Sequence, residues 1–192
     1  MNFYRVLVLA SFLAGSTACT AILVETTGEQ GIQENPRERT AGAVVEDRSI
    51  ETKIVVNMKS QEPAFREANF DVVSYNGVVL LVGQVQSDSL KARATEIAQQ
   101  ASAKIVRIHN ELEVAGSTGF LARSNDAWIS TKVRTQLRAN DGVPGRDIQV
   151  VCENGAIFLM GLITQPEGDR AAALARNISG VTKVVKVFEY IN

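Results

Sequence analysis

The strongest constraint on the fold is an internal duplication. The segment "DRSIETKI" from Asp47 aligns with "DAWISTKV" from Asp126 at an offset of 79 residues, and "YNGVVLLVG" ending at Gly83 aligns with "ENGAIFLMG" ending at Gly161 at an offset of 78. A third segment, "AKIVRIHNEL" near residue 103, aligns with "TKVVKVFEYI" near residue 182, again at an offset of 79. Because the order is kept and the offsets are almost constant, the chain contains one domain twice in tandem.

Apolar residues spaced four positions apart predict one helix at the start of each copy. These residues are Ile50, Ile54 and Met58 in the first copy and Ile129, Val133 and Leu137 in the second. Asp47 and Asp126 precede the two apolar stripes, and aspartate is a preferred N-cap residue. We therefore expect each helix to begin at its aspartate.

The rest of each copy predicts a hairpin, a second helix and a third strand. Asn76-Gly77 and Asn154-Gly155 interrupt β-branched runs, and Asn-Gly favours the type I′ turn of a two-residue β-hairpin. Helical spacing returns over 90–101 and 171–178, and strand-like composition over 104–114 and 183–191.

These elements predict the α+β class, with two tandem α-β-β-α-β domains. In each domain the economical packing places both helices on one face of a three-stranded mixed sheet. We expect the first domain over 46–114, a Gly- and Ser-containing linker over 115–124, and the second domain over 125–192.

The N-terminus is typical of an exported protein. Arg5 precedes an apolar run over 6–15 that suits a secretory signal peptide and is too short to span a bilayer. Thr17-Ala18 before Cys19 resembles the lipobox of bacterial lipoproteins, which implies cleavage after residue 18 and a lipid on the Cys19 thiol. Ser16 stands where that motif prefers leucine, and residues 16–18 also fit an ordinary signal peptidase. We expect a signal peptide over 1–18, and a lipidated N-terminus and flexible tether over 19–45.

Composition and motifs argue against several functions. A formal charge of −1 and a pI near 5.9 are not those of a nucleic-acid-binding protein. His109, the only histidine, aligns with Phe188, and Cys152 aligns with Ser74, so both are expected to be structural. Without paired carboxylates, a metal-ligand motif or a glycine-rich phosphate loop, we expect no enzyme activity, catalytic residue, metal, cofactor or small-molecule substrate.

Trp128 is the residue that points to a surface function. On a helix it lies about 140° from the centre of the apolar stripe, near Lys132, whereas its counterpart in the first copy is Ser49. An exposed tryptophan beside cations suits a membrane interface. The alternative is that Trp128 packs against the linker or the first domain. Phe120 and Leu121, large apolar residues in the expected linker, favour the membrane interface, where they would insert beside Trp128, but they would equally fill an interdomain seam.

The residues also carry a family resemblance. The α-β-β-α-β unit, the glycine that ends its second strand and the stretch "SNDAWISTKVRTQL" are similar to the BON domain. Two such domains behind a lipobox resemble the dual BON-domain lipoproteins of Gram-negative bacteria, over nearly the whole mature chain. Thr20 after Cys19, in place of an aspartate, implies anchoring at the periplasmic face of the outer membrane.

The resemblance implies a non-enzymatic envelope-integrity protein whose second BON domain binds anionic phospholipid membranes. We expect the binding region to comprise Phe120, Leu121, Asp126, Trp128, Thr131, Lys132, Arg134 and Arg138. In the alternative interpretation the protein is a periplasmic adaptor, and the same surface docks on a partner such as the outer-membrane protein assembly machinery.

Overall fold

The computed structural model describes residues 35–116 and 120–191, and the side chains of residues 120–122 lie outside this description. The expected signal peptide and Cys19 also lie outside it. Residues 36–192 form one compact unit, and the description below concerns this unit.

The first domain contains two helices, a short 3-10 helix and three strands. They are α2 (Ala41–Gln61), η2 (Pro63–Arg66), β1 (Asn69–Tyr75), β2 (Val78–Val85), α3 (Asp88–Ala101) and β3 (Arg107–Val114). Strand β2 is central, antiparallel to β1 and parallel to β3.

The second domain repeats this order without the 3-10 helix. Its elements are α4 (Phe120–Arg138), β4 (Gln149–Glu153), β5 (Ala156–Ile163), α5 (Gln165–Arg176) and β6 (Lys183–Tyr190). Strand β5 is central, antiparallel to β4 and parallel to β6. The predicted fold class, two α-β-β-α-β units with mixed three-stranded sheets, is confirmed.

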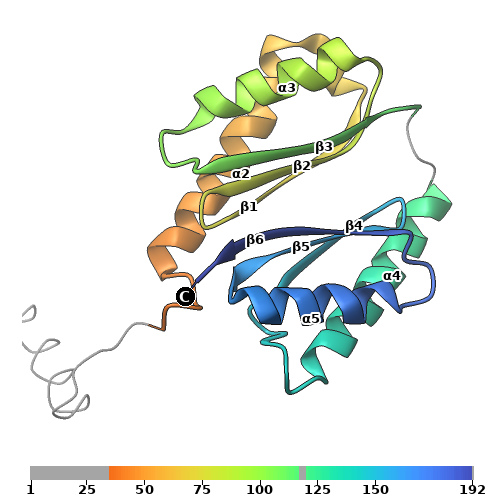
Figure 1. Cartoon of the computed structure of the whole chain (residues 1–192). Helices are drawn as coiled ribbons and strands as arrows, with labels where there is room; N and C mark the ends of the chain where they lie inside the picture. The colour runs from red at the N-terminus through yellow and green to blue at the C-terminus, as the bar shows by residue number, and fades with distance from the viewer. Residues whose placement is uncertain (1–34, 117–119, 192) are drawn as a thin grey trace, which may run out of the picture. The chain divides into compact units, whose positions relative to one another are not determined.

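In each domain both helices cover one face of the sheet, as predicted (Figure 1). The α2 stripe packs with Leu81 and Leu112 of the first sheet, and the α4 stripe packs with Leu159 and Phe188 of the second. All six residues of the two predicted stripes are fully buried. The helical period in the sequence therefore identified the core-facing side of both helices.

The predicted type I′ turns are also confirmed. Asn76 and Gly77 have φ angles of 53° and 77°, and Asn154 and Gly155 have φ angles of 50° and 75°. Positive φ at both central residues defines this turn, and asparagine and glycine adopt it at low cost.

The predicted helix starts are wrong. α2 begins at Ala41 and α4 at Phe120, each six residues before the aspartate that was expected to cap it. Thr40 caps α2 instead, since its hydroxyl accepts a hydrogen bond from the Ala43 N–H at 3.1 Å. Aspartate interrupts the apolar stripe before Ile50 and before Ile129, so the hydrophobic pattern did not reveal the first turns of the two helices. The helices extend into the segments expected to be tether and linker.

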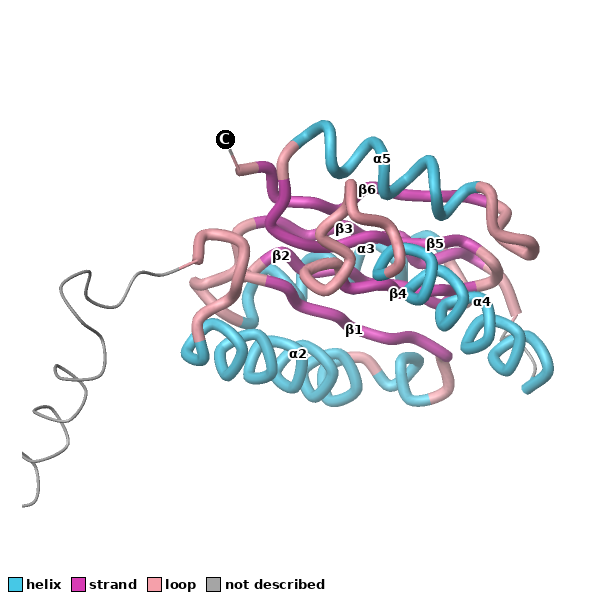
Figure 2. The backbone as a smooth tube through the Cα atoms, turned by 90° about the horizontal axis from the view of Figure 1, so that it is seen from below, coloured by secondary structure: helices cyan, strands magenta, loops and turns pink. Residues whose placement is uncertain are grey.

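The opposite faces of the two sheets pack against each other. Strand β2 is buried along its whole length, and its residues Val78, Leu80 and Val82 point away from the helices of their own domain. They pack with Phe158 and Met160 of β5 in one apolar cluster, hereafter the interdomain seam. Figures 1 and 2 show the resulting layers, with the two sheets inside and the helices outside.

The strand register corrects the alignment of the third segment. Gly83 pairs with Leu112, and Gly161 pairs with Phe188, so Leu112 and Phe188 are the structural counterparts, at an offset of 76 residues. The offset differs because α5 has 12 residues whereas α3 has 14. The counterpart of His109 is therefore Val185, which packs against the interdomain seam, and not Phe188.

Candidate functional site

Trp128 lies on the outer side of α4. Its side chain is 57% exposed, whereas Ile129 beside it is fully buried. Trp128 does not pack against the first domain in the interdomain seam, since the seam consists of sheet residues from β1, β2, β4, β5 and β6 and of Ile191. The other alternative, packing against the linker, falls on residues outside the description.

Lys132 lies one turn along the helix and is stacked on the indole. Its Nζ atom is 3.1 Å from the centroid of the Trp128 ring, a cation–π contact. Together with Thr131, Thr135, Gln136 and Ile178, these two side chains line a surface hollow of about 390 Å³, hereafter the Trp128 hollow. Ile178, beyond the end of α5, was not predicted, because only the packing of α5 beside α4 brings it here.

Asp126 is buried and does not belong to the Trp128 hollow. Its carboxylate accepts hydrogen bonds from the N–H groups of Asn154 and Gly155, both at 2.8 Å, and from the Cys152 thiol at 3.4 Å. Asp126 therefore positions the β4–β5 turn.

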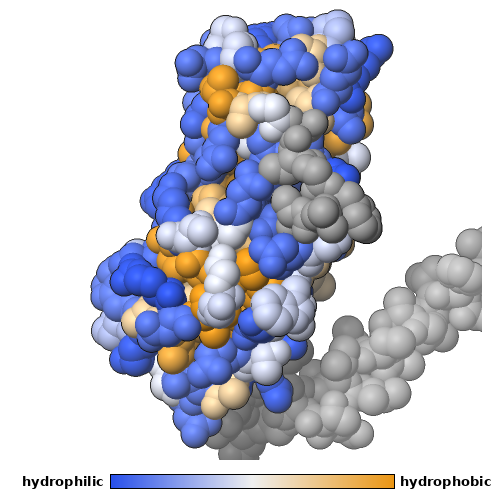
Figure 3. Space-filling view, turned by 90° about the vertical axis from the view of Figure 1, so that its right-hand side faces the viewer, coloured by the Kyte–Doolittle hydropathy of each residue, from blue (hydrophilic) through white to orange (hydrophobic). Residues whose placement is uncertain are grey.

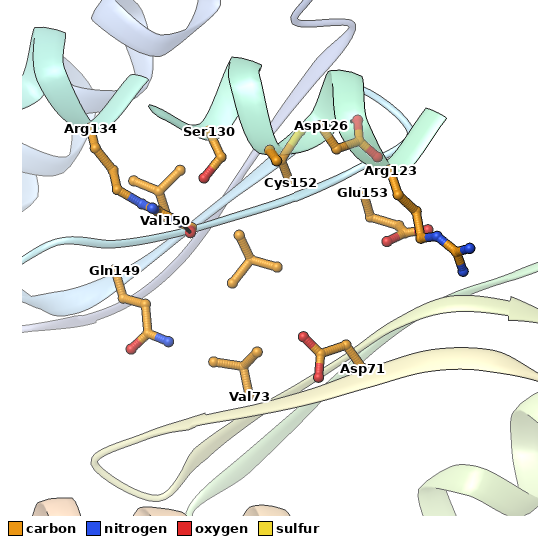
Figure 4. A pocket seen from close by; sticks show the side chains of 12 residues that line it. Asp71, Val73, Arg123, Asp126, Ser130, Arg134, Gln149, Val150, Cys152 and Glu153 are labelled. Carbon is orange, nitrogen blue, oxygen red and sulfur yellow. Dashed lines mark hydrogen bonds between the residues drawn. The ribbon is translucent and has the colours of Figure 1, made fainter. Parts of the chain in front are cut away.

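Arg134 lies on the opposite side of α4 from Trp128. Its guanidinium donates to the Val150 carbonyl of β4 at 3.3 Å and lines a different cavity, of about 380 Å³, with Ser130 and Glu153 (Figure 4). Arg138 is exposed in the last turn of α4. Phe120 and Leu121 form the first turn of α4, and their side chains lie outside the described residues. Of the predicted residues, the structure thus brings together Trp128, Thr131 and Lys132.

Cys152 and His109, the two side chains expected to be structural, both have shifted pKa values. Burial and the neighbouring Asp126 carboxylate raise the pKa of the Cys152 thiol to about 12, so the thiol stays protonated at neutral pH. Burial, followed by the Arg107 charge, lowers the pKa of His109. Within 35–116 and 120–191, no group of three or more His, Cys, Asp or Glu residues is arranged to hold a metal ion.

Seven large apolar residues are exposed in the described part of the chain, and Trp128 is one of them. In the described part of the chain, no helix is both long enough and apolar enough to cross a bilayer. Figure 3 shows one face of the molecule, where small apolar patches lie among hydrophilic surface. A surface contact would therefore depend on a few exposed side chains such as Trp128.

Comparison with known proteins agrees with this architecture. The model of the BON domain matches residues 46–116 and 125–192. The chain is 36% identical over 154 residues to the outer membrane lipoprotein DolP of Haemophilus influenzae, covering 80% of this chain and 79% of that protein. It is 37% identical over 153 residues to the 21 kDa hemolysin of Actinobacillus pleuropneumoniae, covering 80% and 78%.

A more distant relative is the osmotically-inducible protein Y of Escherichia coli K12, with 24% identity over 92% of this chain and 89% of that protein. The matched segments cover the two α-β-β-α-β units seen in the structure, apart from the first turns of α2 and α4. The chain belongs to the BON-domain family and is a DolP-like protein with two BON domains.

Proposed function

We propose that this protein is an outer-membrane lipoprotein that binds anionic phospholipid through the Trp128 hollow of its second BON domain and supports envelope integrity. The observation that carries the proposal is the pairing of the exposed Trp128 with Lys132 at 3.1 Å. The outer-membrane location is supported by the similar protein from Haemophilus influenzae, which is named an outer membrane lipoprotein.

The chemistry of the pair suits the polar surface of a bilayer. An indole prefers the headgroup region, because its ring is apolar and its N–H can donate a hydrogen bond. The ammonium of Lys132 meets lipid phosphates, with an attraction of about 1 kcal/mol per cation near an anionic surface. Thr131 and Thr135 beside them supply hydroxyl groups. Asp126 acts indirectly, by holding the turn against α4.

The first BON domain provides an internal comparison. The positions equivalent to Trp128 and Lys132 hold Ser49 and Lys53. The first domain thus carries the lysine without the tryptophan. We infer that the second domain alone supplies the membrane contact.

The proposed anchor is Cys19. We expect Cys19→Ser to abolish acylation and to move the protein from the membrane fraction to the soluble periplasmic fraction. Intact mass and fractionation would show both changes. A wild-type protein without the added mass of a lipid would favour cleavage by the ordinary signal peptidase.

The surface contact is tested with Trp128→Ala and Lys132→Glu, each in a Cys19→Ser background so that no acyl chain contributes. Co-sedimentation is measured with phosphatidylglycerol-containing vesicles and with phosphatidylcholine vesicles. Both variants should lose binding to the anionic vesicles, and Lys132→Glu should lose at least about five-fold at low salt and less at high salt. Lys53→Glu is the matched control and should bind as wild type.

Folding is measured in parallel. Trp128 is exposed, so Trp128→Ala should change the unfolding free energy by no more than about 0.5 kcal/mol. Normal vesicle binding by both variants would contradict the phospholipid proposal and favour a protein partner for the same hollow.

A further inference from the structure

Strand β4 is an edge strand whose outer side is open for hydrogen bonding. In the β4–β5 hairpin, Val151 and Glu153 direct their N–H and C=O groups toward β5, because alternate residues of an antiparallel pair exchange hydrogen bonds. Val150 and Cys152 therefore direct theirs outward. The bond from Arg134 to the Val150 carbonyl agrees with this alternation.

The first BON domain closes the same edge with acidic side chains. In β1 the Ser74 N–H donates to Glu51 Oε1 at 3.0 Å, and the Val72 N–H donates to Asp71 Oδ1 at 2.9 Å. The outward N–H groups of Val72 and Ser74 are thus satisfied within the domain. Such protection prevents another chain from pairing with an edge strand.

The second domain has neither of these two acids at the equivalent positions. Ser130 stands at the position of Glu51, and Gln149 at the position of Asp71. Among the described residues, the outward N–H groups of Val150 and Cys152 have no side-chain acceptor. Ser130 is only 5% exposed, and its hydroxyl oxygen has no hydrogen-bond partner in the structure.

A cavity of about 380 Å³ follows this edge, within the size range of ligand sites, and is lined by every residue of β4. One wall is α4, with Ser130 turned into the space, and the other is β1, with Val73 and the Asp71 carboxylate (Figure 4). One end of the cavity carries two carboxyl groups, those of Asp71 and Glu153, and one guanidinium, that of Arg123. We call this cavity the β4 groove.

We propose that the β4 groove binds an extended peptide segment of a partner protein, which adds to β4 as a further strand. The outward N–H and C=O groups of Cys152 and the N–H of Val150 pair with the peptide backbone. The Val150 carbonyl joins them when Arg134 moves aside. An apolar peptide side chain packs on Val73 and Val151, and a basic one meets Asp71 and Glu153.

This mode of recognition takes its affinity from main-chain hydrogen bonds and its selectivity from alternate side chains. Backbone pairing favours a peptide over a lipid headgroup or a sugar, because a strand matches the spacing of both donors and acceptors. The site is distinct from the Trp128 hollow, which lies on the other side of α4.

The decisive variant is Ser130→Glu, which introduces at the equivalent position the acid that covers the β1 edge in the first domain. The probe is a fluorescein-labelled heptapeptide of alternating threonine and valine with one lysine near an end, measured by fluorescence polarisation in the Cys19→Ser protein. We expect saturable binding by the wild-type groove and at least about ten-fold weaker binding by Ser130→Glu. Ser130→Ala, which leaves the edge open, should bind as the wild type does.

Two further measurements distinguish the addition of a strand from binding in another mode. The same peptide with alternate backbone amides N-methylated should bind at least about ten-fold more weakly, since it lacks the required donors. Gln149→Asp introduces the second acid of the first domain and should also weaken peptide binding. This variant replaces Ser130→Glu as the test if Ser130→Glu melts below the wild type. Vesicle binding through Trp128 should be unchanged in all three variants.

The proposal is overturned if the unmethylated peptide shows no saturable binding up to about 1 mM. It is also overturned if methylated and unmethylated peptides bind equally, or if both introduced acids leave binding unchanged. Self-association of the wild type that is lost in Ser130→Glu would assign the groove to a second copy of this chain and would also overturn it.

Discussion

Asp47 shows how a single buried carboxylate holds its domain together. It is 2% exposed and accepts hydrogen bonds from the N–H groups of Asn76 and Gly77, from the Ser74 hydroxyl and from Arg39. Burial alone would raise the pKa of Asp47, but these hydrogen bonds outweigh burial and hold that pKa below its ordinary value. The carboxylate thereby ties the N-terminal half of α2 to the β1–β2 turn.

A depressed folded-state pKa implies a specific pH dependence. The stabilisation by ionised Asp47 is complete above the ordinary aspartate pKa, about 4, and is lost as the pH falls through the lower folded-state value. Asp47→Asn should cost roughly 1–3 kcal/mol at pH 7, because it leaves buried donors without their charged acceptor. Urea unfolding from pH 7 to 2 checks this, and a difference from the wild type that does not shrink below pH 4 would contradict it.

At the scale of elements, Gly83 sets the path of β2 past β1. Its φ angle is 117°, and a Cβ atom there would lie 2.6 Å from the Phe70 Cα atom, as well as against the Asn69 carbonyl. Only glycine fits both the backbone conformation and the space. The repeated glycine in the sequence therefore reports a close approach between strands.

Gly83→Ala should accordingly destabilise the protein by at least roughly 1–3 kcal/mol, the usual range for such backbone strain. Gly116→Ala is the control, because a Cβ atom there meets nothing within 4 Å. Thermal melting of both variants provides the measurement. Equal melting temperatures would show that the strands can separate at Gly83 without cost.

At the scale of the whole molecule, the interdomain seam makes the two BON domains one unit. Leu80 is fully buried and Phe158 is 3% exposed, and they belong to the same apolar cluster. Polar contacts also link the domains, since Arg37, just before α2, bonds Glu167 of α5 at 2.8 Å, and the Asn76 side chain donates to Glu189 of β6 at 2.9 Å. Separated domains would expose the seam, so point variants test function better than isolated domains.

A shared core predicts cooperative unfolding. Phe158→Ala should cost roughly 3–5 kcal/mol, as for other buried phenylalanines, and should destabilise both domains together. Trp128, the only tryptophan, reports on the second domain by fluorescence, whereas circular dichroism reports on both. Coincident urea transitions are expected. Two separate transitions, with only one of them shifted in Phe158→Ala, would mean that the seam contributes little.

The sequence by itself determined the architecture of each domain and the outward direction of Trp128. The apolar period of α2 and α4, the Asn-Gly turns and the duplication encode these features locally, since they depend on neighbouring residues and on residues one turn apart. The starts of α2 and α4 escaped the same pattern, because aspartate and not a large apolar residue comes before each stripe, at Asp47 and Asp126.

Only the tertiary structure decided what depends on packing between distant segments. It showed that the counterpart of His109 in the second domain is Val185, because His109 pairs with Leu80 of β2 and Val185 pairs with Phe158 of β5. The sequence alignment had matched His109 with Phe188, since strand register depends on pairing across the sheet and shifts with the length of the helix in between. It also divided the cations of α4 between two surfaces, with Lys132 on Trp128 and Arg134 on β4. A strand such as β2, apolar at nearly every position, indicates in sequence that both of its faces are buried. Only the structure shows that the second sheet covers the face that points away from the helices.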